Sequence, residues 1–140
     1  MAPRRTIFVD TGYLVALLDP RDRLNPRALE VAKALAKEGA ALLTTDAVFL
    51  ELGNYFARGP LRAHCSKWIR ALRVAQGWEV LQLERALLLH AEERYTSHAD
   101  KNWSLTDCHS MEVMRARGLS EVATPDAGFA QAGFRCLLRE

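Results

Sequence analysis

Two kinds of segment follow one another along this chain. The first is a short run of apolar residues that ends in turn residues, and the second is a longer stretch whose apolar residues have the spacing of a helix. The first apolar run, Ile7–Val9, stops at Asp10 and is followed by Thr11, Gly12 and a second apolar stretch, Tyr13–Leu18. A short apolar run bounded by turn residues is typical of a buried strand. This stretch therefore predicts a strand, a turn and a helix, with the Asp10 carboxylate where the strand ends.

The same succession continues to the end of the chain. Further strands are predicted at Ala40–Thr44, Trp78–Leu83, Glu121–Thr124 and Phe134–Leu138. Helices are predicted over residues 25–38, from Thr45 and Asp46 to near Gly59, and over Leu61–Gln76, Glu84–His98 and Leu105–Arg117, with a short helical turn at Asp126–Ala132. The residues expected to face the core are Leu29, Ala32, Leu35 and Ala36 in the second helix and Val48, Leu52 and Tyr55 in the third.

Strands separated by helical crossovers predict a mostly parallel sheet with helices on both faces, which is a three-layer α/β/α sandwich. No internal repeat, low-complexity tract or linker interrupts the 140 residues. A chain of this length is large enough to bury one core. We therefore expect a single domain over residues 1–140.

Composition narrows the class of protein. A hydrophobic share of 49% excludes a disordered chain. No apolar run is long enough to span a bilayer, and the basic first residues are not followed by the apolar region of a signal peptide. Cys65, Cys108 and Cys136 are dispersed, which favours a reducing compartment over a disulfide framework. We expect a cytoplasmic protein with no membrane partner.

Lysine and arginine total 19 against 17 acidic residues, so the net charge is only +2 and affinity for nucleic acid needs local clustering. Between Glu51 and Glu79 the chain has no acidic residue. A solvated helix face is the usual meaning of such a basic run. The alternative is a track that binds RNA phosphates, whose members would be Arg58, Arg62, Lys67, Arg70 and Arg73.

Four carboxylates stand out by their positions. Asp10 and Asp126 each follow a predicted strand, whereas Glu51 and Asp107 lie on apolar faces of predicted helices. Three of them also have an ordinary explanation: a salt bridge or a place at the edge of the stripe for Glu51, a capping box with Ser104 for Asp107, and an N-cap for Asp126. Both explanations stay open for each of these three taken singly, and Asp10 alone indicates little.

The four acids together indicate a cation. In a parallel sheet with helical crossovers, strand ends and the following helix starts lie at the same edge, so these acids are expected to converge. Converging negative charges repel one another unless cations offset them. Oxygen ligands suit Mg²⁺ or Mn²⁺, and such ions in a carboxylate pocket are suited to phosphoryl transfer. The histidines have no spacing typical of a zinc site; they are His64, His90, His98 and His109.

Taken together, four stretches of the chain resemble the PIN domain family and, within it, the VapC-like toxin ribonucleases of prokaryotic toxin–antitoxin pairs. They are IFVDTG around Asp10, TTDAVFLELGN around Glu51, DKNWSLTDCHSMEVM around Asp107 and TPDAGFAQAGF around Asp126. The resemblance implies a PIN-like fold and a Mg²⁺- or Mn²⁺-dependent endoribonuclease whose catalytic and metal-binding residues are these four acids. It also implies an RNA substrate, a cognate antitoxin and a homodimer, with supporting polar residues at Thr11, Asn54, Ser104 and Thr106.

The chain departs from the family's pattern at two positions beside Asp126. Gly128 stands where many relatives carry a histidine or a basic residue, and Pro125 is uncommon between the threonine and the aspartate. Two other functions stay open, a non-catalytic PIN-like protein that binds RNA or a partner, and an RNA-processing nuclease outside a toxin–antitoxin pair. An aspartyl phosphatase is disfavoured because its second acid is replaced by Gly12, and the chain lacks the glycine-rich motifs of dinucleotide-binding and P-loop proteins.

Overall fold

The computed structural model describes residues 4–139, and the strands of that part of the chain form one sheet. The strands are β1 (Thr6–Val9), β2 (Ala41–Thr45), β3 (Trp78–Leu81), β4 (Glu121–Ala123) and β5 (Arg135–Cys136). Their order is β3-β2-β1-β4-β5, and each neighbouring pair runs parallel. The predicted parallel sheet is confirmed.

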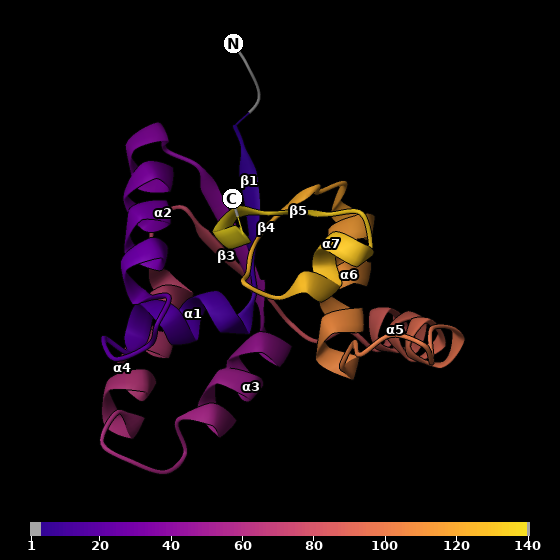
Figure 1. Ribbon diagram of the computed structural model, residues 1–140, viewed down its shortest axis with the longest axis horizontal. Coiled ribbons are helices and arrows are strands. Elements are labelled where there is room, and N and C mark those ends of the chain that lie inside the picture. Colours follow the sequence, from indigo (N-terminus) through magenta and orange to yellow (C-terminus); the bar gives the residue numbers. More distant parts are fainter. Residues whose placement is uncertain (1–3, 140) are drawn as a thin grey trace.

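Helices connect each strand to the next and cover both faces of the sheet. Figure 1 shows α1 and α2 on one side of the sheet and α6 and α7 on the other. The helices are α1 (Thr11–Leu18), α2 (Asn25–Glu38), α3 (Asp46–Tyr55), α4 (Arg62–Val74), α5 (Arg85–Ser97), α6 (Leu105–Arg117) and α7 (Ala127–Gln131). The three-layer α/β/α arrangement that the sequence predicts is confirmed.

The order of the strands reverses next to β1. From β1 the chain moves outward through β2 to β3, and it then returns to the other side of β1 with β4 and β5. In open α/β sheets, ligands bind beyond the carboxyl ends of the strands at such a reversal. Val9 pairs with Ala123, and the N–H of Asp10 donates to the carbonyl of Ala123 at 3.2 Å. The ends of β1 and β4 are therefore adjacent, which brings Asp10 close to the segment that follows β4.

β1 lies at the centre of the hydrophobic core. Ile7, Phe8 and Val9 expose no surface, as expected for a parallel strand covered on both faces. The buried side chains around this strand come from its neighbours and from the inner faces of the helices; they include Leu14, Leu43, Val48, Leu52, Met111, Met114 and Val122. The position of Asp10 is thus fixed by a rigid and dry strand.

The buried face of α2 differs from the predicted one. Ala28, Val31 and Leu35 are buried, whereas Leu29 is 46% exposed and Ala36 is also exposed. The prediction that these last two residues face the core is wrong. The predicted and observed stripes have the same helical period and differ by a rotation about the helix axis, which the period alone does not determine.

The inner face of α3 is predicted correctly except at its end. Val48 and Leu52 are buried, but Tyr55 is 60% exposed, so the prediction that it faces the core is wrong. Tyr55 is the last residue of the helix, and the residue after it, Phe56, is the one that is buried in the core. The buried positions therefore continue from Val48 and Leu52 to Phe56 and not to Tyr55.

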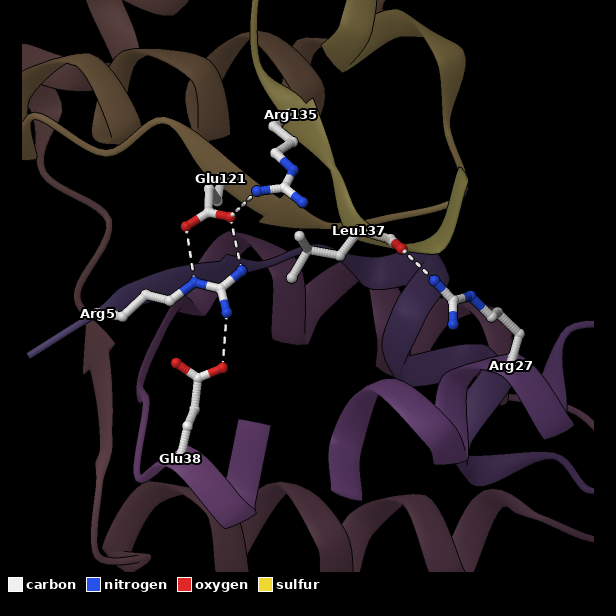
Figure 2. A network of polar contacts seen from close by, with 6 residues as sticks. All are labelled: Arg5, Arg27, Glu38, Glu121, Arg135 and Leu137. Atoms are coloured by element: carbon white, nitrogen blue, oxygen red, sulfur yellow. Dashed lines mark hydrogen bonds and ion pairs between the residues drawn. The ribbon is translucent and has the colours of Figure 1, made fainter. Parts of the chain in front are cut away.

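The last predicted strand, Phe134–Leu138, is only partly a strand. β5 covers Arg135–Cys136, and Leu137–Arg139 form a turn of 3₁₀-helix whose two leucines are buried. Arg27 of α2 holds this turn, because its Nη2 donates to the carbonyl of Leu137 at 3.1 Å (Figure 2). A buried turn and a buried strand give the same short apolar run in a sequence.

Within residues 4–139 no helix is both long enough and apolar enough to cross a bilayer. Cys65, Cys108 and Cys136 are free thiols, and all three are buried. They contribute to the core as small apolar side chains.

A charged network ties the start of β1 to β4 and to α2 (Figure 2). The guanidinium of Arg5 donates from Nε and Nη2 to the two carboxylate oxygens of Glu121 at 2.8 and 2.6 Å, and from Nη1 to Glu38 at 2.6 Å. Arg135 of β5 donates to the same Glu121 at 3.3 Å. The Glu121 side chain is only 18% exposed. A bidentate pair that is partly shielded from water stabilises a fold more than an ordinary surface ion pair does.

Replacing Glu121 by glutamine is expected to lower the free energy of unfolding by about 1–2 kcal/mol, because the change removes the charge from a bidentate and partly buried pair. The matched control is Glu38→Gln, whose side chain is 39% exposed and accepts one bond from the same arginine. Its expected loss is below about 0.5 kcal/mol. Urea unfolding measures both variants. Equal losses would contradict a specific stabilising role for Glu121.

Candidate active site

Asp10 lies between β1 and α1, and its side chain is turned away from the helix that it precedes. It occupies the N-cap position of α1 but makes no side-chain capping bond. Its Oδ2 instead accepts a hydrogen bond from the hydroxyl of Thr124, 2.8 Å away, beyond the end of β4. Its Oδ1 is buried, and no hydrogen bond of normal geometry reaches that oxygen from the described residues. A buried carboxylate oxygen without a partner is costly, so this atom is a place for a proton or a cation.

Burial sets the protonation of Asp10, of which only 4% is exposed. Loss of hydration raises the pKa of Asp10 to about 7, and the charges of Asp107 and Glu51 act in the same direction. The hydrogen bond from the Thr124 hydroxyl and the nearby N–H of Thr11 act against this rise. Carboxylates far apart in the sequence therefore share one electrostatic environment.

α3 brings Glu51 to this environment. The helix starts at Asp46, after Thr45, whose hydroxyl accepts a hydrogen bond from the N–H of Val48 at 3.2 Å and caps the first turn. Glu51 is half-buried. No lysine or arginine within residues 4–139 forms an ion pair with it. A buried salt bridge therefore does not explain this glutamate.

Asp107 has a structural role as well as a place in the site. Its N–H donates to Ser104 Oγ at 3.0 Å, and its Oδ2 accepts from the N–H of Ser104 at 2.9 Å, which forms the predicted capping box of α6. Loss of hydration raises the pKa of Asp107 to about 6, and the charges of Asp126 and Glu51 act in the same direction. The capping bonds orient this carboxylate without neutralising it.

Asp126 also caps a helix, as the ordinary explanation predicts. Its Oδ1 accepts from the N–H of Gly128 at 2.8 Å, in the first turn of α7. Its own N–H donates to the Thr124 hydroxyl at 3.1 Å, and that hydroxyl donates in turn to Asp10. One buried threonine at the end of β4 therefore connects two of the four acids.

These acids line one cavity of about 740 Å³, which lies beyond the carboxyl ends of β1 and β4. Of the expected supporting residues, Thr11, Asn54 and Ser104 also line it. Thr106 is half-buried and is not among the lining residues. The structure thus brings together Asp10, Glu51, Asp107 and Asp126 with three of the four supporting side chains, while their catalytic and metal-binding roles stay predictions.

The cavity suits a divalent cation by charge and by type of ligand. No arginine or lysine of the described residues forms an ion pair with any of the four acids. The available donors are oxygens of carboxylates, hydroxyls and an amide, which Mg²⁺ and Mn²⁺ prefer. In the described part of the chain, no three acidic, histidine or cysteine side chains already form a metal centre. The buried oxygen of Asp10 that accepts no hydrogen bond from the described residues is the atom of this cavity that best fits an ion.

Asp22, Tyr55 and Thr124 also line the cavity, although the sequence did not single them out as site residues. Asp22 lies in the loop between α1 and α2, where its Oδ1 accepts a hydrogen bond from the N–H of Leu24 at 2.8 Å. A charged residue in a charged loop is normally solvated, so its sequence position gave no signal of a site. The signal for Thr124 was a hydroxyl at a strand end, two residues before Asp126 in the chain.

The basic residues predicted to contact RNA do not line this cavity. All five are exposed, after α3 or along α4; they are Arg58, Arg62, Lys67, Arg70 and Arg73. Arg73 is also paired, with its Nη2 2.8 Å from Oδ1 of Asp46 and its guanidinium over the ring of Phe49, 5.1 Å from the ring centre. Arg73 therefore joins α4 to α3 in addition to being part of this exposed basic surface.

The chain was compared with known families, sequences and structures. Residues 7–135 match the PIN domain family, whereas no curated protein sequence matches significantly. VapC20 of Mycobacterium tuberculosis, a toxin that cleaves the sarcin–ricin loop, is similar with a TM-score of 0.80 and 26% identity, covering 91% of this chain and 95% of that one.

Two further solved structures share the fold at lower identity. VapBC2 of Rickettsia felis, bound to a DNA fragment from its promoter, gives a TM-score of 0.69 with 11% identity, covering 94% of this chain and 96% of that one. FitAcB of Neisseria gonorrhoeae gives 0.63 with 18% identity, covering 93% and 94%. At these identities the likeness concerns the fold alone.

The family match extends from the start of β1 to β5 and includes all four acids of the cavity. The fold, the strand order and the placement of the acids agree with it. The chain belongs to the PIN domain family, and it is similar in structure to the VapC20 toxin.

Proposed function

We propose that this chain is a divalent-metal-dependent endoribonuclease, the toxin of a toxin–antitoxin pair, which works in the cytoplasm as one domain. The observation that carries the proposal is the cavity where Asp10, Glu51, Asp107 and Asp126 meet, with Oδ1 of Asp10 buried and unbonded among the described residues. The similarity to VapC20, described as a toxin that cleaves the sarcin–ricin loop, supports RNA as the substrate class.

The chain's own residues prepare the site before a ligand arrives. Thr124 fixes the orientation of Asp10 through its 2.8 Å hydrogen bond, and the capping box with Ser104 fixes that of Asp107. Groups held in advance do not have to be ordered during the reaction, which lowers its entropic cost. Asn54 adds a neutral amide to the cavity wall, where it can hydrogen-bond a phosphate oxygen.

Asp10, Glu51, Asp107 and Asp126 would hold the ion, which supplies positive charge beside the scissile phosphate and favours in-line attack by water. With pKa values of about 7 and 6, Asp10 and Asp107 are partly protonated near neutral pH. Loading of the site therefore releases protons from these carboxylates, so the affinity for metal rises with pH.

A non-catalytic RNA-binding protein of the same family is the second candidate. It is favoured by one observation, that within residues 4–139 no three ligating side chains already form a metal centre. This candidate function does not account for the buried carboxylates of Asp10 and Asp107, whose pKa values are raised. A protein that only binds RNA gains nothing from carboxylates that repel phosphate.

We also propose a cognate antitoxin that inhibits the enzyme, and a homodimer as the form of the free toxin. Both rest on the resemblance to VapC-like toxins. Co-expression with the protein encoded beside its gene, followed by size-exclusion chromatography, tests the two proposals together.

Inhibitor-free protein is expected to cleave RNA with Mn²⁺ or Mg²⁺ and to lose cleavage in EDTA. Asp10→Asn and Asp107→Asn are each expected to slow cleavage at least about 100-fold, because each removes a charged oxygen and keeps the shape of the side chain. The control is Asp100→Asn, an exposed aspartate paired with Lys101 outside the cavity, which is expected to cleave normally. Gel analysis of a defined RNA measures the rates. Wild-type rates in Asp10→Asn would sink the proposal.

Asp10→Asn is also expected to stabilise the metal-free protein at neutral pH. The folded-state pKa of about 7 lies above the ordinary value of 3.8, so between these values the folded protein holds more protons than the unfolded one. Wild-type stability therefore falls as the pH rises through this window, and the variant escapes the fall. The difference is expected to grow between about pH 4 and pH 7 by up to about 4 kcal/mol. Thermal unfolding in EDTA measures it, and a difference independent of pH would contradict the assignment.

Lys67→Glu combined with Arg70→Glu is expected to weaken RNA binding at least about 10-fold at low salt. Two contacts to single-stranded RNA contribute about 1.4 to the slope of log K against log salt, so the slope is expected to fall by at least that amount. Binding is measured in an Asp10→Asn background to prevent cleavage. The control is the double reversal Lys33→Glu with Lys37→Glu, on exposed positions of α2. Equal losses in both double variants would mean that only net charge matters.

A further inference from the structure

Two close contacts between a ring and a glycine lie on either side of Asp126 in the chain. In one, Pro125 packs against Gly12, and in the other, Trp103 packs against Gly128. A Cβ built on Gly128 would come within 2.9 Å of Cδ1 and 3.1 Å of Nε1 of Trp103. A Cβ built on Gly12 would come within 2.9 Å of Cδ of Pro125. Carbon atoms do not approach so closely, so only glycine fits either position without movement of its neighbours. Pro125 directly precedes Asp126 in the chain and Gly128 follows it by two residues, so both sides of this acid are held.

Trp103 connects this contact to the other helix-capping acid. The residue is only 7% exposed and directly precedes Ser104, whose capping box holds Asp107. Its indole also packs against the ring of His98, with 4.9 Å between ring centres. Trp103 is therefore fixed relative to Asp107 through the backbone and relative to Gly128 through its ring.

The contact at Gly128 acts directly on the orientation of Asp126. The N–H of Gly128 donates to Oδ1 of Asp126 at 2.8 Å, and a Cβ on Gly128 would lie 3.2 Å from the same oxygen. Any shift of this backbone therefore shifts the carboxylate. The indole Nε1 of Trp103 is buried and has no hydrogen-bond partner among the described residues, so the indole acts through its shape.

We propose that Trp103 is a positioning residue of the metal site, which sets the separation of the Asp107 and Asp126 carboxylates by packing its indole against Gly128. The inference rests on the proposed function to the extent that these acids bind the cation. It goes beyond that function because Trp103 is not among the residues that line the cavity.

Trp103→Leu is expected to weaken Mn²⁺ binding about 10-fold, the size of effect seen when a group that orients a metal ligand is lost. Trp103→Phe keeps an aromatic ring but lacks Nε1, one of the two indole atoms nearest Gly128, so its affinity for Mn²⁺ is expected to fall, by less than that of Trp103→Leu. Isothermal titration calorimetry of the metal-free full chain with Mn²⁺ measures both variants. The matched control is Trp78→Leu on β3, which is half-buried and away from this cavity, and whose Mn²⁺ affinity is expected to be unchanged.

A double-mutant cycle with Asp126→Asn separates positioning from general destabilisation. If Trp103 acts through Asp126, Trp103→Leu weakens Mn²⁺ binding much less in the Asp126→Asn background than in the wild type. Losses that simply add would overturn the inference, as would wild-type affinity in Trp103→Leu. Should Trp103→Leu fail to fold, Gly128→Ala perturbs the same contact from the other side. Its expected loss of affinity is at least about 5-fold, and an unchanged affinity would again overturn the inference.

The same titrations distinguish this inference from the proposed enzyme. Mn²⁺ binding that follows the expected pattern in a protein that cleaves no RNA would overturn the nuclease proposal and support the role of Trp103. A wild-type chain that binds no Mn²⁺ at all would overturn both.

Discussion

The central constraint of the structure is a group of acids at the cavity with which no lysine or arginine of residues 4–139 forms an ion pair. Asp10 follows three fully buried residues of β1, and the loss of hydration there raises its pKa to about 7. Arginines pair with acids elsewhere in the described chain, as Arg5 does with Glu121 at the start of β1, and Arg73 with Asp46 between α4 and α3. Because ion pairs are formed around the cavity but not inside it, the repulsion among its acids is left for a ligand to relieve. The cost to folding is therefore tied to the cation that we propose the cavity binds.

Asp107 and Asp126 can each cap a helix and still line the cavity, because a carboxylate has two oxygens. Asp107 uses Oδ2 for the capping box of α6, Asp126 uses Oδ1 for the N-cap of α7, and Asp10 uses Oδ2 for Thr124. In each side chain one oxygen is fixed by the fold, so the direction of the other is set as well. The structural explanation of Asp107 and of Asp126 thus does not compete with the functional one. An anchored oxygen fixes the direction in which the second one is offered to the proposed ion.

The sequence predicted correctly those features that depend on neighbouring residues in the chain, such as helix caps and turns. The capping box at Ser104 and the glycine stop at Gly118 define α6 as predicted, and the turn after Val9 places Asp10 at a strand end. Patterns failed where tertiary packing decides. The rotation of α2, which exposes Leu29, depends on what the helix packs against, and the exposure of Tyr55 accompanies the burial of Phe56, the residue after the helix. Neither piece of information lies within the helix itself.

The two departures from the family's pattern, at Pro125 and Gly128, have physical counterparts elsewhere in the chain. Pro125 packs against Gly12, and Gly128 packs against Trp103. In each pair the ring comes so close to the glycine that a side chain on the glycine would clash with it. A histidine or another large side chain at position 128 would occupy the space that the indole fills, so a bulky residue at 128 and a tryptophan at 103 exclude one another in this backbone. Gly128 therefore allows the Trp103 indole to pack at this position. Their steric contact holds the backbone beside Asp126, in addition to the hydrogen bonds that Asp126 and Thr124 form at the start of α7.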